Sequence, residues 1–114
     1  MLSNLTGSRV TNSGRFNVFD SLLDNRGTID NSGIMEVFHF GTYQNKGGQL
    51  DNRSAGSFTN AGSATNLENS TINNSGVIIN DRNLVNAGVI NTLCGGSIIG
   101  PVSGNQPLAG CFDD

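Results

Sequence analysis

Few side chains in this sequence could carry out catalytic or metal-binding chemistry. The 114 residues include one histidine, His39, and no tryptophan. Glu36 lies three residues before His39. In an extended segment, side chains three positions apart point to opposite faces, so the two are not expected to act as an acid–base or metal-binding pair. No nucleophile motif such as Gly-x-Ser-x-Gly and no phosphate-binding loop is present. We therefore expect no catalytic residue, no metal site and no cofactor.

Acidic side chains are the other candidates for chemistry. Asp24, Asp30 and Asp51 recur along the chain, and acids of this kind could line a carbohydrate-binding cleft. An active site should gather such carboxylates in one groove, whereas these are spread along the sequence. A solvated face is the simpler interpretation, and it predicts that the protein is not an enzyme.

The two cysteines, Cys94 and Cys111, lie near the end of the chain. They lack the Cys-x-x-Cys spacing and have no nearby histidine, which argues against a zinc site. We expect a disulfide that closes a C-terminal loop and contributes about 3 kcal/mol; two buried free thiols are the alternative. A disulfide would indicate export from the cytoplasm. The chain is thus divided into repeats over residues 1–93 and a disulfide-closed cap or tail of the same domain over residues 94–114.

The composition is that of a polar, weakly charged chain. It contains 17 Asn, 16 Gly, 12 Ser and 8 Thr, and 13% of its residues are charged, against about a quarter in average globular proteins. The net charge is −3 with six basic residues and no basic cluster, so no nucleic-acid partner is expected. No apolar run approaches the roughly 20 residues of a membrane-spanning helix, so no membrane span is expected.

A short repeat organises the chain and must position any functional side chain. Asn-x-Gly occurs seven times, at Asn12, Asn25, Asn31, Asn45, Asn60, Asn74 and Asn86. An apolar residue stands two positions before the Asn in nearly every copy. Extending this register gives Val10, Phe16, Leu23, Ile29, Met35, Tyr43, Leu50, Phe58, Ala64, Ile72, Ile78, Leu84, Ile90 and Ile98. The steps of six, seven or eight residues do not match the three- and four-residue steps of an amphipathic helix.

The repeat instead suits short β-strands joined by corners. Residues two apart share a face of a strand, so each apolar residue and the Asn after it should both point inward. Tight hairpins favour Asn-Gly or Asp-Gly, and the chain contains neither dipeptide. Asn-x-Gly is expected to form a wider corner in which Gly takes the left-handed conformation. Equivalent units that stack in register make parallel strands, so we predict an all-β fold, a parallel β-solenoid of six- to eight-residue units.

Stacked corners should bring the Asn amides of successive coils into hydrogen-bonding distance, as an asparagine ladder. The predicted ladder residues are Asn12, Asn25, Asn31, Asn45, Asn52, Asn60, Asn66, Asn74, Asn80 and Asn86. We favour three units per coil, about 18–22 residues, and therefore about five coils, because side chains from three walls fill a small interior well. A two-sided coil of about 12–15 residues is the alternative.

The repeat units resemble those of a known class of protein. Units such as GTIDNSG (27–33), GSFTNAG (56–62), STINNSG (70–76) and NAGVINTL (86–93) are similar to the short Asn/Gly-rich repeats of secreted prokaryotic surface proteins. These include adhesins of the filamentous-haemagglutinin kind and fibre or sheath proteins built from β-solenoids. The resemblance spans roughly Val10 to Gly100 and lies in composition and period. It implies an extracellular or cell-surface protein with a structural or adhesive role.

Two groups of residues break the repeat and are candidate interface positions. The first is the aromatic cluster of Phe38, Phe40 and Tyr43, which could contact a subunit or a glycan or could fill a bulge in a strand. The second is a set of apolar residues at outward positions in the C-terminal half: Val77, Ile79, Val85, Val89 and Ile99. Exposed, they would form a patch that marks an interface, covered either by the C-terminal tail or by another chain.

The leading functional hypothesis is a non-catalytic extracellular structural or adhesive module that self-associates, as a homopolymer or longer array, into a surface fibre or sheath. A glycan- or ice-binding β-helix module is the alternative, and a polysaccharide-active β-helix enzyme is the third. Ice binding needs a regular array of Thr on one face. The residues before the apolar positions, such as Arg15, Gln49 and Val77, form no such array.

Overall fold

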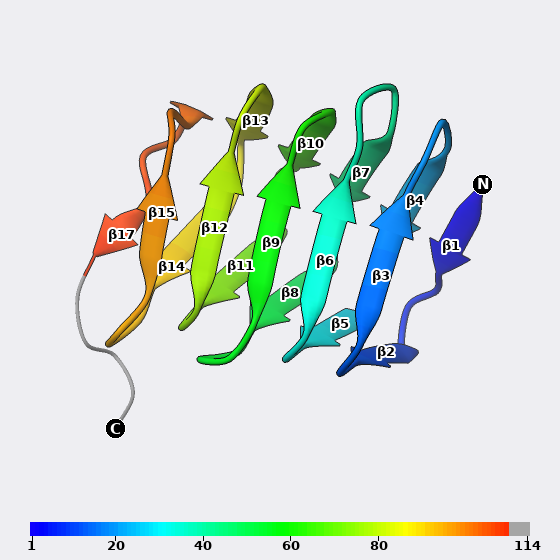
Figure 1. The fold of residues 1–114 in the computed structure, drawn as a ribbon, viewed down its shortest axis with the longest axis horizontal. Helices are drawn as coiled ribbons and strands as arrows, with labels where there is room; N and C mark the ends of the chain where they lie inside the picture. The colour runs from blue at the N-terminus through cyan, green and yellow to red at the C-terminus, as the bar shows by residue number, and fades with distance from the viewer. Residues whose placement is uncertain (110–114) are drawn as a thin grey trace.

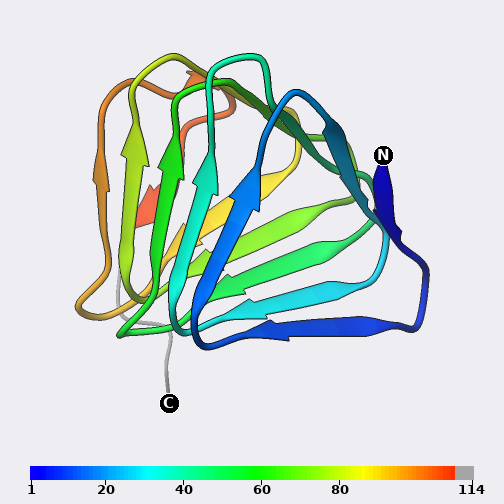
Figure 2. The ribbon, with the colours of Figure 1, turned by 45° about the vertical axis from the view of Figure 1, so that its right-hand side comes forward.

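The chain folds into a three-sided parallel β-solenoid (Figure 1). The computed structural model describes residues 1–109, in which 17 short strands and no helix occur. Each coil contributes one strand to each of three parallel sheets, which we call walls A, B and C. Figure 2 shows the coils obliquely, as triangles stacked from the N-terminus to the C-terminus. The predicted fold class and the three-sided coil are therefore confirmed.

Each wall takes every third strand of the chain. Wall A consists of β1 (Leu2–Asn4), β4 (Leu22–Asn25), β7 (Thr42–Asn45), β10 (Ser63–Asn66), β13 (Asn83–Asn86) and β16 (Ser103–Gly104). Wall B consists of β2 (Arg9–Asn12), β5 (Thr28–Asn31), β8 (Gln49–Asn52), β11 (Thr71–Asn74), β14 (Val89–Thr92) and β17 (Leu108–Ala109). Wall C consists of β3 (Arg15–Val18), β6 (Ile34–Val37), β9 (Ser57–Asn60), β12 (Val77–Asn80) and β15 (Ser97–Ile99).

The apolar positions that repeat along the sequence are stacked on one another in the three walls. The second residue of each four-residue strand points inward and lies beside its counterpart one coil on, as Leu50 lies beside Ile72 on wall B. The repeat between stacked residues varies from 17 residues, between Asn91 and Leu108, to 23, between Met35 and Phe58. The corners absorb this variation, because the strands themselves stay aligned.

The interior is a single column of apolar side chains from the three walls. Its fully buried members are Leu23, Ile29, Met35, Val37, Tyr43, Leu50, Phe58, Ala64, Ile72, Ile78, Leu84 and Ile90. Tyr43 is 1% exposed and packs edge-on against Phe58, with ring centroids 5.7 Å apart. Burial raises the pKa of Tyr43, whose Oη has no hydrogen-bond partner within the described residues. The expectation that Tyr43 lies at an interface is therefore wrong, because its place in the register turns it inward.

Three hydrogen-bonded asparagine ladders connect the coils, which confirms the predicted ladder. In each ladder, every rung except the last donates from Nδ2 to Oδ1 of the Asn one coil on, with N–O distances of 2.8–3.0 Å. The rungs are Asn4, Asn25, Asn45, Asn66 and Asn86 on wall A, Asn12, Asn31, Asn52 and Asn74 on wall B, and Asn60 and Asn80 on wall C. Val18 and Val37 take the first two rung positions of wall C.

A second bond from each rung fixes the corner. Asn31 Nδ2, for example, also donates to the main-chain oxygen of Ser57, the first residue of β9 in the next coil, at 3.1 Å. Each amide thus joins the end of one strand to the start of another. The apolar register predicted from the sequence begins at Val10, so Asn4 was not predicted as a ladder residue. In the structure Asn4 is the first rung of wall A. The apolar residue two positions before it, Leu2, follows the same pattern and could have indicated it.

The glycines of Asn-x-Gly serve a purpose different from the one predicted. Of the seven, Gly47 alone has a positive φ, 71°. Five of the remaining six, all except Gly14, lie where successive coils come too close for a side chain. A Cβ on Gly33 would lie 2.2 Å from the carbonyl oxygen of Gly14, and one on Gly76 would lie 2.3 Å from that of Gly56. The expectation of left-handed corners is therefore wrong for most copies, because close coil stacking is what selects glycine there.

Parallel stacking continues beyond residue 93. β15 pairs with β12, β16 with β13 and β17 with β14, so the described part of the C-terminal segment extends the three walls. Cys111 lies outside the described residues, and the disulfide between Cys94 and Cys111 stays a prediction. No helix in residues 1–109 is long and apolar enough to cross a membrane.

Candidate functional site

The acid and histidine candidates lie apart from one another. Glu36 faces Arg15, with 3.5 Å between the closest charged atoms, and His39 Nδ1 is in hydrogen-bond contact with the guanidinium of Arg82. Within residues 1–109, no three His, Cys, Asp or Glu side chains come together as a group that could hold a metal ion. Any functional site in this part of the chain must therefore be built from other residue types.

Asp30 and Asp51 are neighbours on the outer face of wall B. Asp30 accepts from Arg53, at 2.6 Å, and from Arg9, at 3.2 Å. Asp51 accepts from Asn73 at 3.0 Å. The hydrogen bond from Arg53 lowers the pKa of Asp30, whereas a general acid at neutral pH needs a raised one. These carboxylates are placed to hold adjacent coils together across the outside of wall B.

The Asp30 network predicts how part of the stability depends on pH. Because Arg53 holds the pKa of Asp30 below its ordinary value of 3.8, the ion pair stabilises the fold above that value and is lost as the pH falls through the lowered pKa. The wild type should melt at a higher temperature than Asp30→Asn at about pH 6, and the difference should shrink as the pH falls below 3.8 and through the lowered pKa. Both arginines are more than half exposed, so the difference should be small. A difference that persists in acid would contradict the assignment.

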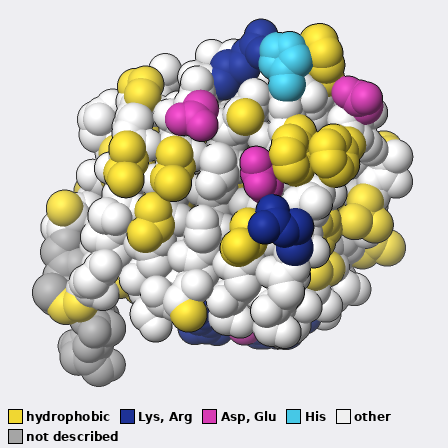
Figure 3. Space-filling model, in the orientation of Figure 1, with side chains coloured by type: hydrophobic (Ala, Val, Ile, Leu, Met, Phe, Trp, Pro, Cys, Tyr) yellow, Lys and Arg dark blue, Asp and Glu magenta, His cyan; other side chains and the backbone are white. Residues whose placement is uncertain are grey.

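The predicted C-terminal apolar patch is divided among the walls. Val77, Ile79 and Ile99 lie on wall C, whereas Val85 lies on wall A and Val89 on wall B. Consecutive strands belong to different walls, so residues that are close in sequence face different directions. Figure 3 shows the apolar side chains that gather over β12 and β15. The five residues therefore do not form one patch, and an interface at the three residues of wall C stays a prediction.

The aromatic segment forms the corner between β6 and β7. Phe38 stacks on Phe19 of the coil before it, with ring centroids 4.1 Å apart and planes 8° from parallel. Phe40 is 74% exposed and has a φ of 71°. A left-handed conformation costs a non-glycine residue about 1–2 kcal/mol. Residues in such strained conformations cluster at functional sites, so Phe40 is the first residue of a candidate site.

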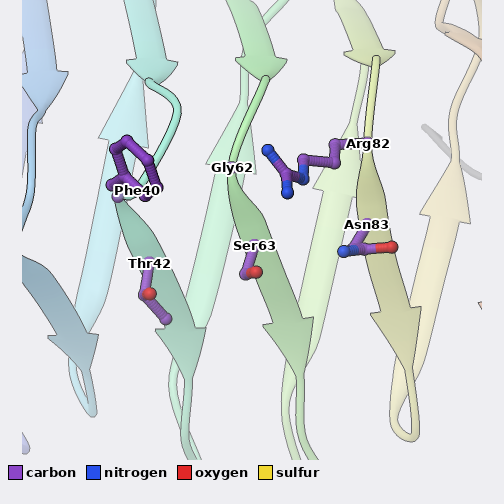
Figure 4. A pocket seen from close by; sticks show the side chains of 7 residues that line it. Phe40, Thr42, Gly62, Ser63, Arg82 and Asn83 are labelled. Atoms are coloured by element: carbon purple, nitrogen blue, oxygen red, sulfur yellow. The ribbon is translucent and has the colours of Figure 1, made fainter.

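A pocket of about 140 Å³ opens beside Phe40 on wall A (Figure 4). It is lined by Phe40, Gly41, Thr42, Gly62, Ser63, Arg82 and Asn83. We call it the Phe40–Arg82 pocket. Figure 4 shows Arg82 extending toward Phe40 above Gly62, with Thr42, Ser63 and Asn83 in a row across three adjacent strands.

Unequal corner lengths create this pocket. The corner between β6 and β7 has four residues, 38–41, whereas the next two corners on this edge have two each, 61–62 and 81–82. The longer corner raises Phe40 above its neighbours. Gly62 has no side chain to fill the space between Phe40 and Arg82. Phe40 was a predicted interface residue, whereas Arg82, Thr42, Ser63 and Asn83 were not predicted from the sequence, because no local motif connects them.

A second hollow lies at the N-terminal end of the solenoid. It measures about 210 Å³, and its lining includes Leu2, Phe16, Phe19 and Leu22.

Comparisons of the chain with protein-family models, with curated proteins and with solved structures gave no match. What the geometry establishes is the architecture, a three-sided parallel β-solenoid with asparagine ladders.

Proposed function

We propose that this protein is a non-catalytic, extracellular structural or adhesive module whose first coil stacks against a coil of a second copy. The observation that carries the proposal is the uncovered N-terminal end of the core. Leu2 occupies an inward position on wall A but is 52% exposed, whereas Leu23, its counterpart one coil on, is 1% exposed. A coil stacked on this end would bury Leu2 as the next coil buries Leu23.

The backbone at this end supports the same contact. β1, β2 and β3 are the outer strands of walls A, B and C, so one edge of each has no neighbouring strand within the described residues. Such edges readily pair with strands of another molecule, and natural solenoids usually cover them with polar caps. Parallel pairing with a second copy would continue all three walls at once.

The ladders differ at their two ends. At the C-terminal end the last rungs donate to main-chain oxygens, as Asn74 does to Ser97 at 2.9 Å and Asn86 does to Asn105 at 2.9 Å. At the N-terminal end the Oδ1 of Asn4 accepts no hydrogen bond from residues 1–109. A stacked coil could supply that donor. The first rung of wall A therefore has an acceptor that a stacked coil could use.

A substitution at Gly14 should weaken self-association and leave the fold of the isolated chain intact. It has the place in its corner that Gly33 has one coil on, and a Cβ added to it meets no atom within 4 Å. A stacked coil would lie where that Cβ points. Gly14→Ala should therefore remain folded and associate more weakly than the wild type in sedimentation experiments over a range of protein concentrations.

Thr11→Ala is the matched control, because Thr11 is exposed and lies on the outer face of the same coil. It should leave association unchanged. A wild-type protein that stays strictly monomeric up to millimolar concentration would rule out self-association, and equal association of Gly14→Ala and the wild type would rule out stacking at this end.

A further inference from the structure

Arg82 differs from the other arginines of the chain in its partners. Arg9, Arg15, Arg26 and Arg53 each form an ion pair with a carboxylate. Arg82 has no carboxylate partner among residues 1–109, and its one recorded side-chain contact is with His39 Nδ1. A guanidinium has five N–H donors, so most of those of Arg82 stay open to a ligand. The lining of the Phe40–Arg82 pocket contains no carboxylate either, although the chain has a net charge of −3. The pocket therefore favours an anion.

The position of Arg82 is fixed by the same corner that carries Phe40. His39 accepts the hydrogen bond from Arg82, and its ring contacts that of Phe40, with centroids 4.0 Å apart. The guanidinium and the exposed aromatic ring are therefore held on opposite sides of one pocket. A planar guanidinium held in place suits a carboxylate, which it binds with two parallel hydrogen bonds.

The rest of the pocket offers apolar and uncharged polar contacts. The face of Phe40 carries partial negative charge and can pack against polarised C–H groups. Thr42, Ser63 and Asn83 occupy equivalent outward positions of β7, β10 and β13, and neighbouring strands lie about 4.8 Å apart. Their hydroxyl and amide groups form a row of hydrogen-bond donors and acceptors. A ligand that uses all three features has a ring with C–H faces, several hydroxyl groups and one carboxylate.

We infer that the Phe40–Arg82 pocket binds an acidic sugar, a pyranose ring that bears a carboxylate. The carboxylate pairs with Arg82, the C–H face of the ring packs on Phe40, and the hydroxyl groups bond to the row of Thr42, Ser63 and Asn83. The inference is independent of the stacking proposed above, because the pocket lies on β7, β10, β13 and the corners before them. Gly14→Ala should leave sugar binding unchanged, so each proposal can fail without the other.

The test is a titration of the ¹⁵N-labelled protein followed by amide chemical shifts. Methyl glucuronide is the acidic ligand, and methyl glucoside, which lacks the carboxylate, is its matched control. Methyl glucuronide should shift the amides of residues 41–42, 62–63 and 82–83 and should bind about 10- to 100-fold more tightly, which is the contribution of one charge-assisted contact. Equal affinity for the two sugars, or no shift at these amides, would overturn the inference.

Three variants separate the roles of the pocket residues. Arg82→Gln should remove the preference for glucuronide, whereas Phe40→Ala should weaken the binding of both sugars. Arg26→Gln is the control, because Arg26 pairs with Asp24 at a different corner, and it should change neither affinity. Amide shifts far from the pocket report whether each variant is folded, and Arg82→Lys, which keeps the charge without the planar fork, should give an intermediate preference if Arg82→Gln does not fold.

A peptide carboxylate is the competing ligand. N-acetyl-aspartate amide carries the carboxylate but no sugar ring, and it should bind far more weakly than methyl glucuronide. If it shifted the same amides with equal affinity, the pocket would be a site for acidic peptides and the sugar assignment would be wrong.

Discussion

Replacing a ladder asparagine with aspartate should lower the free energy of unfolding by about 3–5 kcal/mol at neutral pH, the cost of an unpaired buried charge. Asn31 and Asn74 are the test sites, since both are 0% exposed. Asn31 donates to Asn52 Oδ1 at 2.9 Å and to Ser57 O at 3.1 Å. A carboxylate cannot donate, so both acceptors would lose this bond and would face a negative charge.

The double variant Asn31→Asp/Asn74→Asp should be largely unfolded. A domain of this size has a total stability of about 5–15 kcal/mol, and two such losses remove most of it. The single variants, measured by urea unfolding followed by circular dichroism, give the size of each effect. Asn83→Asp is the control, because Asn83 is exposed on the outer face of β13, and it should change stability by less than about 0.5 kcal/mol.

Acid should partly rescue the ladder variants. Burial raises the pKa of a carboxyl group, so the new side chain should take up a proton as the pH falls and then donate one hydrogen bond. The stability difference from the wild type should therefore shrink toward about pH 4. A single ladder variant with wild-type stability at neutral pH would show that the asparagine amides are not what holds the coils together.

Adding one methyl group at Gly33 or Gly76 should lower the free energy of unfolding by about 1–3 kcal/mol or more. The new Cβ would lie 2.2 Å or 2.3 Å from a main-chain oxygen of the preceding coil. Main chain cannot move aside as a flexible side chain can, so the two coils would have to separate. Separation would also lengthen the ladder hydrogen bonds beside these corners.

Gly14→Ala is a matched control for this prediction. It makes the same chemical change in the same motif, but no coil precedes it in the described structure and its Cβ meets no atom within 4 Å. Without a clash, alanine should stabilise the isolated fold by about 0.4–1 kcal/mol, because it restricts the unfolded chain. Urea unfolding of the three variants decides the matter. Equal losses at Gly14, Gly33 and Gly76 would show that backbone conformation, and not the space between coils, selects glycine.

The sequence by itself determined the architecture and much of the interior. The two-residue period of a strand is local, so the apolar positions from Val10 to Ile98 and the Asn two residues later could be read directly as inward positions. Asn45 and Asn66, for example, were predicted as ladder residues from spacing alone, and they are hydrogen-bonded at 2.8 Å. Local periodicity also places Tyr43 in the core. Tyr43 was nevertheless predicted as an interface residue, because it lies close in sequence to Phe38 and Phe40.

Only the tertiary structure decided which outward residues lie together. The repeat between stacked residues varies between 17 and 23, and this variation lies in the corners, where no local period exists. Phe40 and Arg82 share a pocket because a four-residue corner and a two-residue corner meet across Gly62. Val85 and Ile79 are separated because the chain turns onto another wall between them. The direction of a side chain within a strand is a local property, but its neighbours across coils depend on the summed length of every corner in between.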